Sequence, residues 1–181
     1  MKNGRPPSWR FNAEKSTDWT VEERERVFDA LEETPSFVKN LEIDSIYRMK
    51  ESRSPENPAA ANGATIVLYD KAFDTSQNLT HILNHEIAHR LFETLPSKER
   101  ESFRVAAKWI EKRTNGEVSY VAGRPESKFM RPNGKISVEE DFADGVAFFI
   151  HQPSRLKATS PEVFQWMEQN LKPKLDNRGR K

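Results

Sequence analysis

The sequence contains no cysteine among its 181 residues. Disulfide bonds and thiolate metal sites are therefore excluded, and any metal ion has to be held by histidine, aspartate or glutamate side chains. The chain also lacks an apolar run long enough to cross a membrane, and its first residues lack the apolar stretch of a secretory signal peptide. We therefore expect no membrane partner and a cytoplasmic location by default, although export by a specialised route would leave the same pattern.

The chain also has no large excess of positive or of negative charge. Lys and Arg together number 29 and Asp and Glu 28, which leaves a net charge of +1. This balance gives no overall field to attract nucleic acid, and the basic C-terminal segment has no aromatic residues interleaved with its cations, so no nucleic-acid partner is expected. Hydrophobic residues make up only 35% of the chain, but 11 Phe and 4 Trp can still build a modest core.

The pattern along the chain predicts one domain over residues 19–171, preceded by a polar arm (residues 1–18) and followed by a basic tail (residues 172–181). A capping-box pattern at Thr20 and Glu23 predicts a helix that ends near residue 33. The segments 41–49 and 65–69 are predicted strands, the second having the strongest β-branched and aromatic content. Further helices are predicted over residues 76–93 (capped by Thr75 or Ser76), 96–112, 138–151 and 161–171, with loops at 52–63 and 114–137. We expect an α+β fold, with a small β-sheet containing residues 65–69 packed on the helix 76–93 and further helices behind.

The segment His85-Glu-Ile-Ala-His89 lies in the middle of the helix predicted over residues 76–93. Residues four apart on a helix share one face, about 5–6 Å apart at Cβ, so two imidazoles placed there can bind one zinc ion. Glu86 lies beside His85, where its carboxylate can reach a water molecule on the metal. A surface helix with a solvated glutamate would show the same letters, but the apolar residues on both sides of the motif favour a buried helix. His81, one turn earlier, is expected at the exposed start of this helix.

A third ligand is expected from the helix predicted over residues 138–151. Glu140 and Asp144 lie four residues apart on one face, with small residues beside them that let a second helix approach. Glu140 can bind zinc, and Asp144 can accept the free ring N–H of a ligand histidine. The alternative is an acidic first turn that favours the helix dipole, which explains residues 139–141 well but Asp144 less well. Whether Glu139 or Glu140 is the ligand stays open.

The combination of His85-Glu-x-x-His89 and Glu140-x-x-x-Asp144 resembles the gluzincin metallopeptidases. The form Glu-Asp-Phe-Ala-Asp, about fifty residues downstream of the histidines, is most similar to catalytic domains related to anthrax lethal factor. Such domains occur in secreted toxins and in some phage-encoded proteins. The segment from Glu140 to Pro153 also resembles the ImmA/IrrE-type regulatory metallopeptidases, whose ligand spacing is generally shorter. The resemblance covers residues 65–171 and implies a zincin-like fold in which the strand 65–69 pairs with the substrate backbone.

The resemblance implies a zinc-dependent endopeptidase that acts on a specific protein or peptide substrate. His85, His89 and Glu140 would be the zinc ligands, Asp144 would support a ligand histidine, and Glu86 would act as general base on zinc-bound water. An alternative function is that of a catalytically inactive binding module with a metallopeptidase fold, or of a structural module associated with a virion or a toxin.

One position departs from the pattern of the lethal-factor-like domains. Those domains carry a tyrosine seven residues before the ligand glutamate, and that position here is Asn133. The residue that stabilises the oxyanion is therefore open, with Tyr120, Arg124, Arg131 and His151 as candidates. The intact Glu86 argues for an enzyme, whereas the absent tyrosine argues for the inactive alternative. Substrate and oligomeric state do not follow from the sequence.

Overall fold

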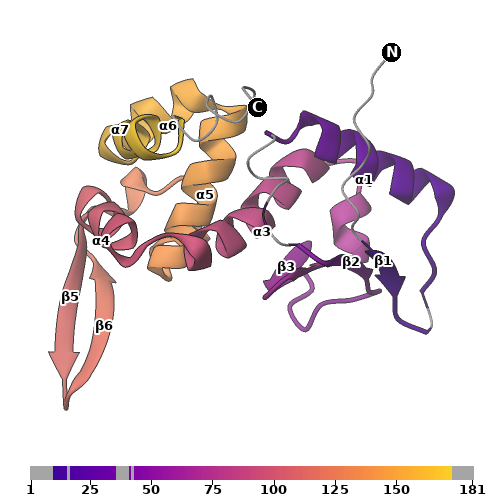
Figure 1. Ribbon diagram of the computed structural model, residues 1–181, viewed down its shortest axis with the longest axis horizontal. Coiled ribbons are helices and arrows are strands. Elements are labelled where there is room, and N and C mark those ends of the chain that lie inside the picture. The colour runs from indigo at the N-terminus through magenta and orange to yellow at the C-terminus, as the bar shows by residue number, and fades with distance from the viewer. Residues whose placement is uncertain (1–9, 16, 36–40, 42, 173–181) are drawn as a thin grey trace. The chain divides into compact units, whose positions relative to one another are not determined.

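The computed structural model describes residues 10–15, 17–35, 41 and 43–172, and its helices and small sheets confirm the predicted α+β class (Figure 1). The chain divides into two compact units, Met1–Arg90 and Leu91–Lys181, where the sequence indicates a single domain. The boundary falls inside helix α3 (Leu79–Thr94). Among the described residues, no helix is long and apolar enough to cross a membrane.

The first unit contains a four-stranded sheet with the strand order β1-β2-β4-β3. Strands β1 (Arg10–Ala13), β2 (Ser45–Arg48) and β4 (Thr65–Leu68) run parallel, and β3 (Ala59–Asn62) runs antiparallel to β4. Strand β4 confirms the strand predicted over residues 65–69. Two strands of this sheet were not predicted: the sequence analysis assigned β1 to the polar arm and β3 to a loop. Residues 1–9 and 16 of the predicted arm lie outside the described residues, as do residues 173–181 of the tail.

The position of β4 within the sheet corrects one expectation. Its main chain pairs with β2 on one side and with β3 on the other. A strand whose two edges are both paired has no free N–H and C=O groups to offer an extended peptide. The expected pairing between residues 65–69 and a substrate backbone is therefore wrong for this sheet, whose edge strands are β1 and β3.

Helix α1 (Val21–Glu33) begins and ends where the capping signals predict. The Thr20 hydroxyl accepts a hydrogen bond from the Glu23 amide, and the Glu23 carboxylate accepts one from the Thr20 amide, both at 3.1 Å. The helix is fixed to the sheet by Arg48 of β2, whose guanidinium lies 2.9 Å from the Glu23 carboxylate and also pairs with Asp70 at the start of the short 3-10 helix η1 (Asp70–Phe73). The unit's core consists of apolar residues from α1, the sheet and α3, among them Val27, Leu31, Ile46, Ile66, Leu68, Leu83 and Ile87.

The second unit is mainly helical and has an aromatic core. Helices α4 (Ser97–Ala106), α5 (Val138–His151), α6 (Pro153–Thr159) and α7 (Pro161–Asn170) follow one another, with 3-10 turns η2 (Glu126–Lys128) and η3 (Pro132–Lys135) before α5. The helices predicted over residues 138–151 and 161–171 are confirmed; α6 was not predicted. The rings of Phe92, Phe103, Phe142 and Trp166 contact one another at centroid distances of 5.0 to 6.3 Å.

A β-hairpin extends from this unit (Figure 1), where the sequence predicts the end of a helix and a long loop. Helix α4 stops at Ala106, and Lys108 has a φ of 58°, a left-handed conformation that ends a helix. Strands β5 (Trp109–Thr114) and β6 (Glu117–Ala122) follow and pair in an antiparallel register. The two residues of the turn, Asn115 and Gly116, have φ values of 52° and 83°, as a type I′ turn requires. The Asn-Gly pair was therefore the local signal for a β-hairpin, and the prediction of a helix followed by a loop did not use it.

Candidate metal centre

The helix that carries the histidine motif starts later than predicted. Helix α3 begins at Leu79, and the Asn78 side chain accepts a hydrogen bond from the His81 amide at 2.9 Å. Asn78 therefore caps the helix, in place of the predicted Thr75 or Ser76. The second residue of the helix, Thr80, donates its hydroxyl to Glu33 of α1 at 2.9 Å. His81 is only 6% exposed, so the expectation of an exposed histidine at this position is wrong.

The histidine motif lies on a buried stretch of α3. The rings of His85 and His89 lie on one face with their centroids 5.0 Å apart and are each partly exposed. Glu86 is 6% exposed, and the two residues between it and His89, Ile87 and Ala88, are buried. The structure thus excludes a helix whose glutamate is solvated. A polar group buried in this way needs an interacting partner, which is consistent with a functional site.

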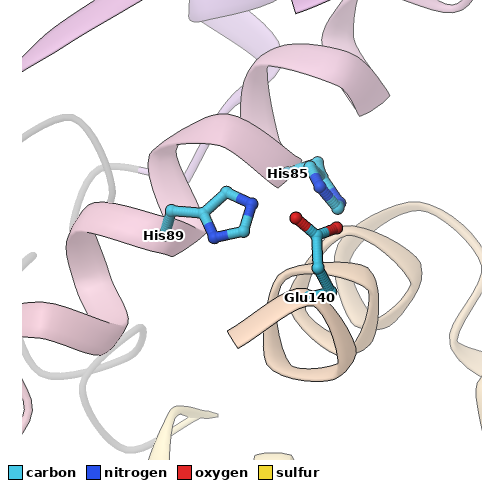
Figure 2. Close-up of side chains that lie close together, drawn as sticks. All are labelled: His85, His89 and Glu140. Carbon is cyan, nitrogen blue, oxygen red and sulfur yellow. The ribbon is translucent and has the colours of Figure 1, made fainter. Parts of the chain in front are cut away.

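Glu140 completes a group of three residues that can hold a metal ion. One ligand atom each from His85, His89 and Glu140 lies within 4.8 Å of the other two. Figure 2 shows both imidazole rings of α3 directed toward the Glu140 carboxylate of α5. In a tetrahedral zinc site, ligand atoms about 2.0–2.1 Å from the metal lie about 3.3 Å from one another, so a group of this size could hold an ion. The glutamate of this group is Glu140; the neighbouring Glu139 is exposed and does not belong to it.

The start of α5 holds the backbone of Glu140 in place. Ser137 caps the helix, and its hydroxyl accepts a hydrogen bond from the Glu140 amide at 3.2 Å. Asp144, one turn further along, is 1% exposed. A Cβ atom at Gly134 of η3 would lie 3.2 Å from the Asp144 carboxylate and 3.7 Å from the Cα of Asp141. The absent side chain of Gly134 therefore lets η3 pass closely over the face of α5 that carries Asp144.

Asp141 is a buried residue of the site that the sequence analysis missed. It is 3% exposed and accepts hydrogen bonds from the Trp109 indole at 2.8 Å and from Arg124, with which it forms an ion pair. Burial raises the pKa of Asp141 to about 6, and the negative charge of Asp144 adds to this rise, whereas Arg124 and the Trp109 hydrogen bond oppose it. An acidic first turn exposed to water does not describe this residue. No local pattern revealed it, because its partners lie 32 and 17 residues earlier in the chain.

The four candidates for an oxyanion donor differ in availability. The Arg124 guanidinium is committed to Asp141 and to the Ala107 carbonyl oxygen, which excludes it. His151 is eleven residues beyond Glu140 on the same helix, about 16 Å along its axis, which is too far for a common reaction centre. Arg131 is exposed directly before η3, and Tyr120 is partly exposed on β6, with the Arg104 guanidinium 4.7 Å from its ring centre. These two residues stay candidates.

No protein-family model matches the chain, and a comparison with curated proteins finds no match either. The resemblance to gluzincins therefore rests on the motif residues themselves.

Proposed function

We propose that the protein is a zinc-dependent endopeptidase of gluzincin type with a zincin-like arrangement. The observation that supports this proposal is the grouping of His85, His89 and Glu140, with Glu86 next to the first histidine on a buried helix. Two imidazoles and one carboxylate are a donor set found in catalytic zinc peptidases, and three protein ligands leave one position for water or substrate. The absence of cysteine from the chain fits a site of this composition.

The chain's own residues then have distinct roles in peptide hydrolysis. A zinc ion, when bound, lowers the pKa of a water molecule toward about 7 and polarises a peptide carbonyl. Glu86 accepts the proton of the attacking water and passes it to the leaving amine. Asp144 accepts the free ring N–H of a ligand histidine and so fixes the orientation of that ring. Arg131 or Tyr120 donates a hydrogen bond to the developing oxyanion.

An extended substrate needs an unpaired strand edge, and we place it on β3. This strand ends the described sheet on the side of β4, and an extended peptide can add to an exposed edge through main-chain hydrogen bonds. Side chains on alternate residues of the peptide would then face the protein, which gives sequence preference at every second position. The Ala61 N–H lies on the edge of β3 that faces away from β4, because hydrogen-bonded pairs alternate along the antiparallel ladder and Pro58 pairs with Tyr69. Replacing Ala61 with proline removes this donor and is expected to reduce cleavage.

The metal site is tested by the zinc content of the purified protein beside paired variants. We expect one zinc ion per chain in the wild type, and loss of zinc in His89→Ala and Glu140→Ala. Glu139→Ala and His151→Ala are the matched controls, because each removes the same type of side chain outside the group of three. Absence of zinc from the wild type after incubation with excess metal would contradict the proposal, as would loss of zinc in the two controls.

Catalysis is tested separately with Glu86→Gln, which keeps the size and burial of the side chain and removes the base. We expect this variant to retain zinc while its cleavage of a mixed peptide library, followed by mass spectrometry, falls by at least about 100-fold. Equal cleavage by both proteins would point to a contaminating peptidase. Zinc binding without any cleavage would favour the alternative of an inactive metallopeptidase-fold binding module.

A further inference from the structure

Both ends of the β5–β6 hairpin converge on one carboxylate next to Glu140. Trp109, the first residue of β5, donates its indole N–H to Asp141 Oδ2 at 2.8 Å. Arg124, two residues beyond β6, donates to Asp141 Oδ1 through Nη2 and to the carbonyl oxygen of Ala107 through Nη1, the latter at 3.0 Å. One guanidinium therefore closes the base of the hairpin and holds Asp141.

The network is shielded from water. The side chains of Asp141 and Arg124 are 3% and 6% exposed, and Trp109 is 7% exposed. The Arg124 guanidinium lies 4.1 Å from the centre of the Phe129 ring, which also packs edge-on against Trp109. Charge-assisted hydrogen bonds without competing water are strong and directional. The contacts therefore restrict both the position and the rotation of the turn that carries Asp141.

The orientation of this turn determines where the Glu140 carboxylate points. Consecutive helical residues leave the axis about 100° apart, so Asp141 faces the hairpin base while Glu140 faces another side. The outer end of a side chain lies roughly 5–6 Å from the helix axis, so a rotation of about 20° moves the Glu140 carboxylate by about 2 Å. That displacement is as long as a zinc–oxygen bond of about 2.0–2.2 Å and would separate the carboxylate from the ion.

We propose that Asp141, held by Trp109 and Arg124, is a positioning residue that fixes Glu140 in the direction required for metal binding. The inference rests on the metal site of the proposed function and does not depend on peptide cleavage. The four residues belong to the same compact unit, Leu91–Lys181. The role also explains why a hairpin whose strands are mostly exposed has a tightly paired, buried base.

The test compares Trp109→Phe with a matched control in the full-length protein. Trp109→Phe removes the donated hydrogen bond and keeps an aromatic ring beside Phe129. Trp166→Phe is the control, because the Trp166 indole also donates a hydrogen bond of 2.8 Å but to Ser102 of α4 rather than to Asp141. The dissociation constant for zinc is measured by competition with a chelator, and Tm is measured in metal-free buffer and at one buffered zinc concentration. We expect zinc affinity to fall about 10- to 100-fold in Trp109→Phe and to stay unchanged in Trp166→Phe.

The shift in Tm caused by zinc separates positioning from a purely structural role. Stabilisation by a ligand grows with its concentration relative to its dissociation constant, so the zinc-induced rise in Tm should be smaller in Trp109→Phe. A second variant, Asp141→Asn, retains an acceptor for Trp109 but loses the charge facing Arg124, and the same result is expected. If both variants lose Tm equally with and without zinc and bind zinc like the wild type, the residues are structural only and the inference is wrong. A wild type that takes up no zinc overturns the metal site as well, whereas one that binds zinc without cleaving peptides overturns only the peptidase proposal.

Discussion

The buried carboxylate of Asp141 makes a definite prediction about pH and stability. Its pKa is about 6 in the folded protein against 3.8 for an unperturbed aspartate. Between these two values the folded protein holds a proton that the unfolded chain has released, so stability decreases as pH rises through this window. The contribution is fully present below pH 3.8 and is lost as pH rises past about 6. The difference of 2.2 pKa units (6 − 3.8) corresponds to about 3 kcal/mol, because one unit equals about 1.4 kcal/mol.

The prediction is tested by the difference between the wild type and Asp141→Asn, because other titrating groups then largely cancel. Free energies of unfolding of both metal-free proteins are measured by urea denaturation at intervals from about pH 4 to 8. We expect the wild type to lose about 2.5 kcal/mol relative to the variant across this range, because a part of the full difference is already lost at pH 4. A relative gain in stability as pH rises would refute the reasoning, because it would mean that the ion pair with Arg124 outweighs desolvation and lowers the pKa of Asp141.

Three further substitutions test the packing and helix capping inside each unit, and the third also tests zinc binding. Phe103→Ala removes a fully buried ring that contacts three other aromatic rings and should lower the free energy of unfolding by about 3–5 kcal/mol in urea; a loss below about 1 kcal/mol would mean that this core is loosely packed. Thr20→Ala removes the capping box of α1 and should cost about 1 kcal/mol by the same assay, and an unchanged stability would show that the cap is redundant. Gly134→Val places methyl groups against the Asp144 carboxylate and should cost about 1–3 kcal/mol of stability and weaken zinc binding; wild-type affinity in a titration would argue against a role for Asp144 at the metal.

The elements that the sequence predicts well are those with a complete local signal. The capping box of α1 spans only four residues, from Thr20 to Glu23, and both of its hydrogen bonds form. Helix α5 has the predicted bounds because Ser137 caps its start and Pro153 follows its end. Strand β4 is predicted from the β-branched and aromatic content of residues 65–69.

The elements that the sequence does not predict depend on distant partners. Strand β3 has the sequence Ala-Ala-Ala-Asn, which has little strand propensity, and forms by pairing with the stronger strand β4. Strand β1 is four residues long and pairs with β2, from which it is separated by all of α1. The hairpin differs from both, since its Asn-Gly turn is a local signal. The apolar spacing of residues 103–110 instead predicted a helix that covers most of β5, and residues 115–116 were assigned to a loop.

The candidate site also has a part that local sequence predicts and a part that depends on distant residues. A helix repeats every 3.6 residues, so His85 and His89 must share a face whatever the rest of the chain does, and Glu140 and Asp144 must likewise share one. Spacing therefore predicts which residues can be ligands on one face of a helix. It does not predict where a ligand side chain points, because that orientation depends on contacts with residues far away in the sequence. For Glu140 these contacts come from Trp109 and Arg124 through Asp141, at separations of 32 and 17 residues. A chain with the same two motifs but without such a pair beside the third ligand should bind zinc more weakly, because its glutamate would have to be oriented at the expense of binding energy.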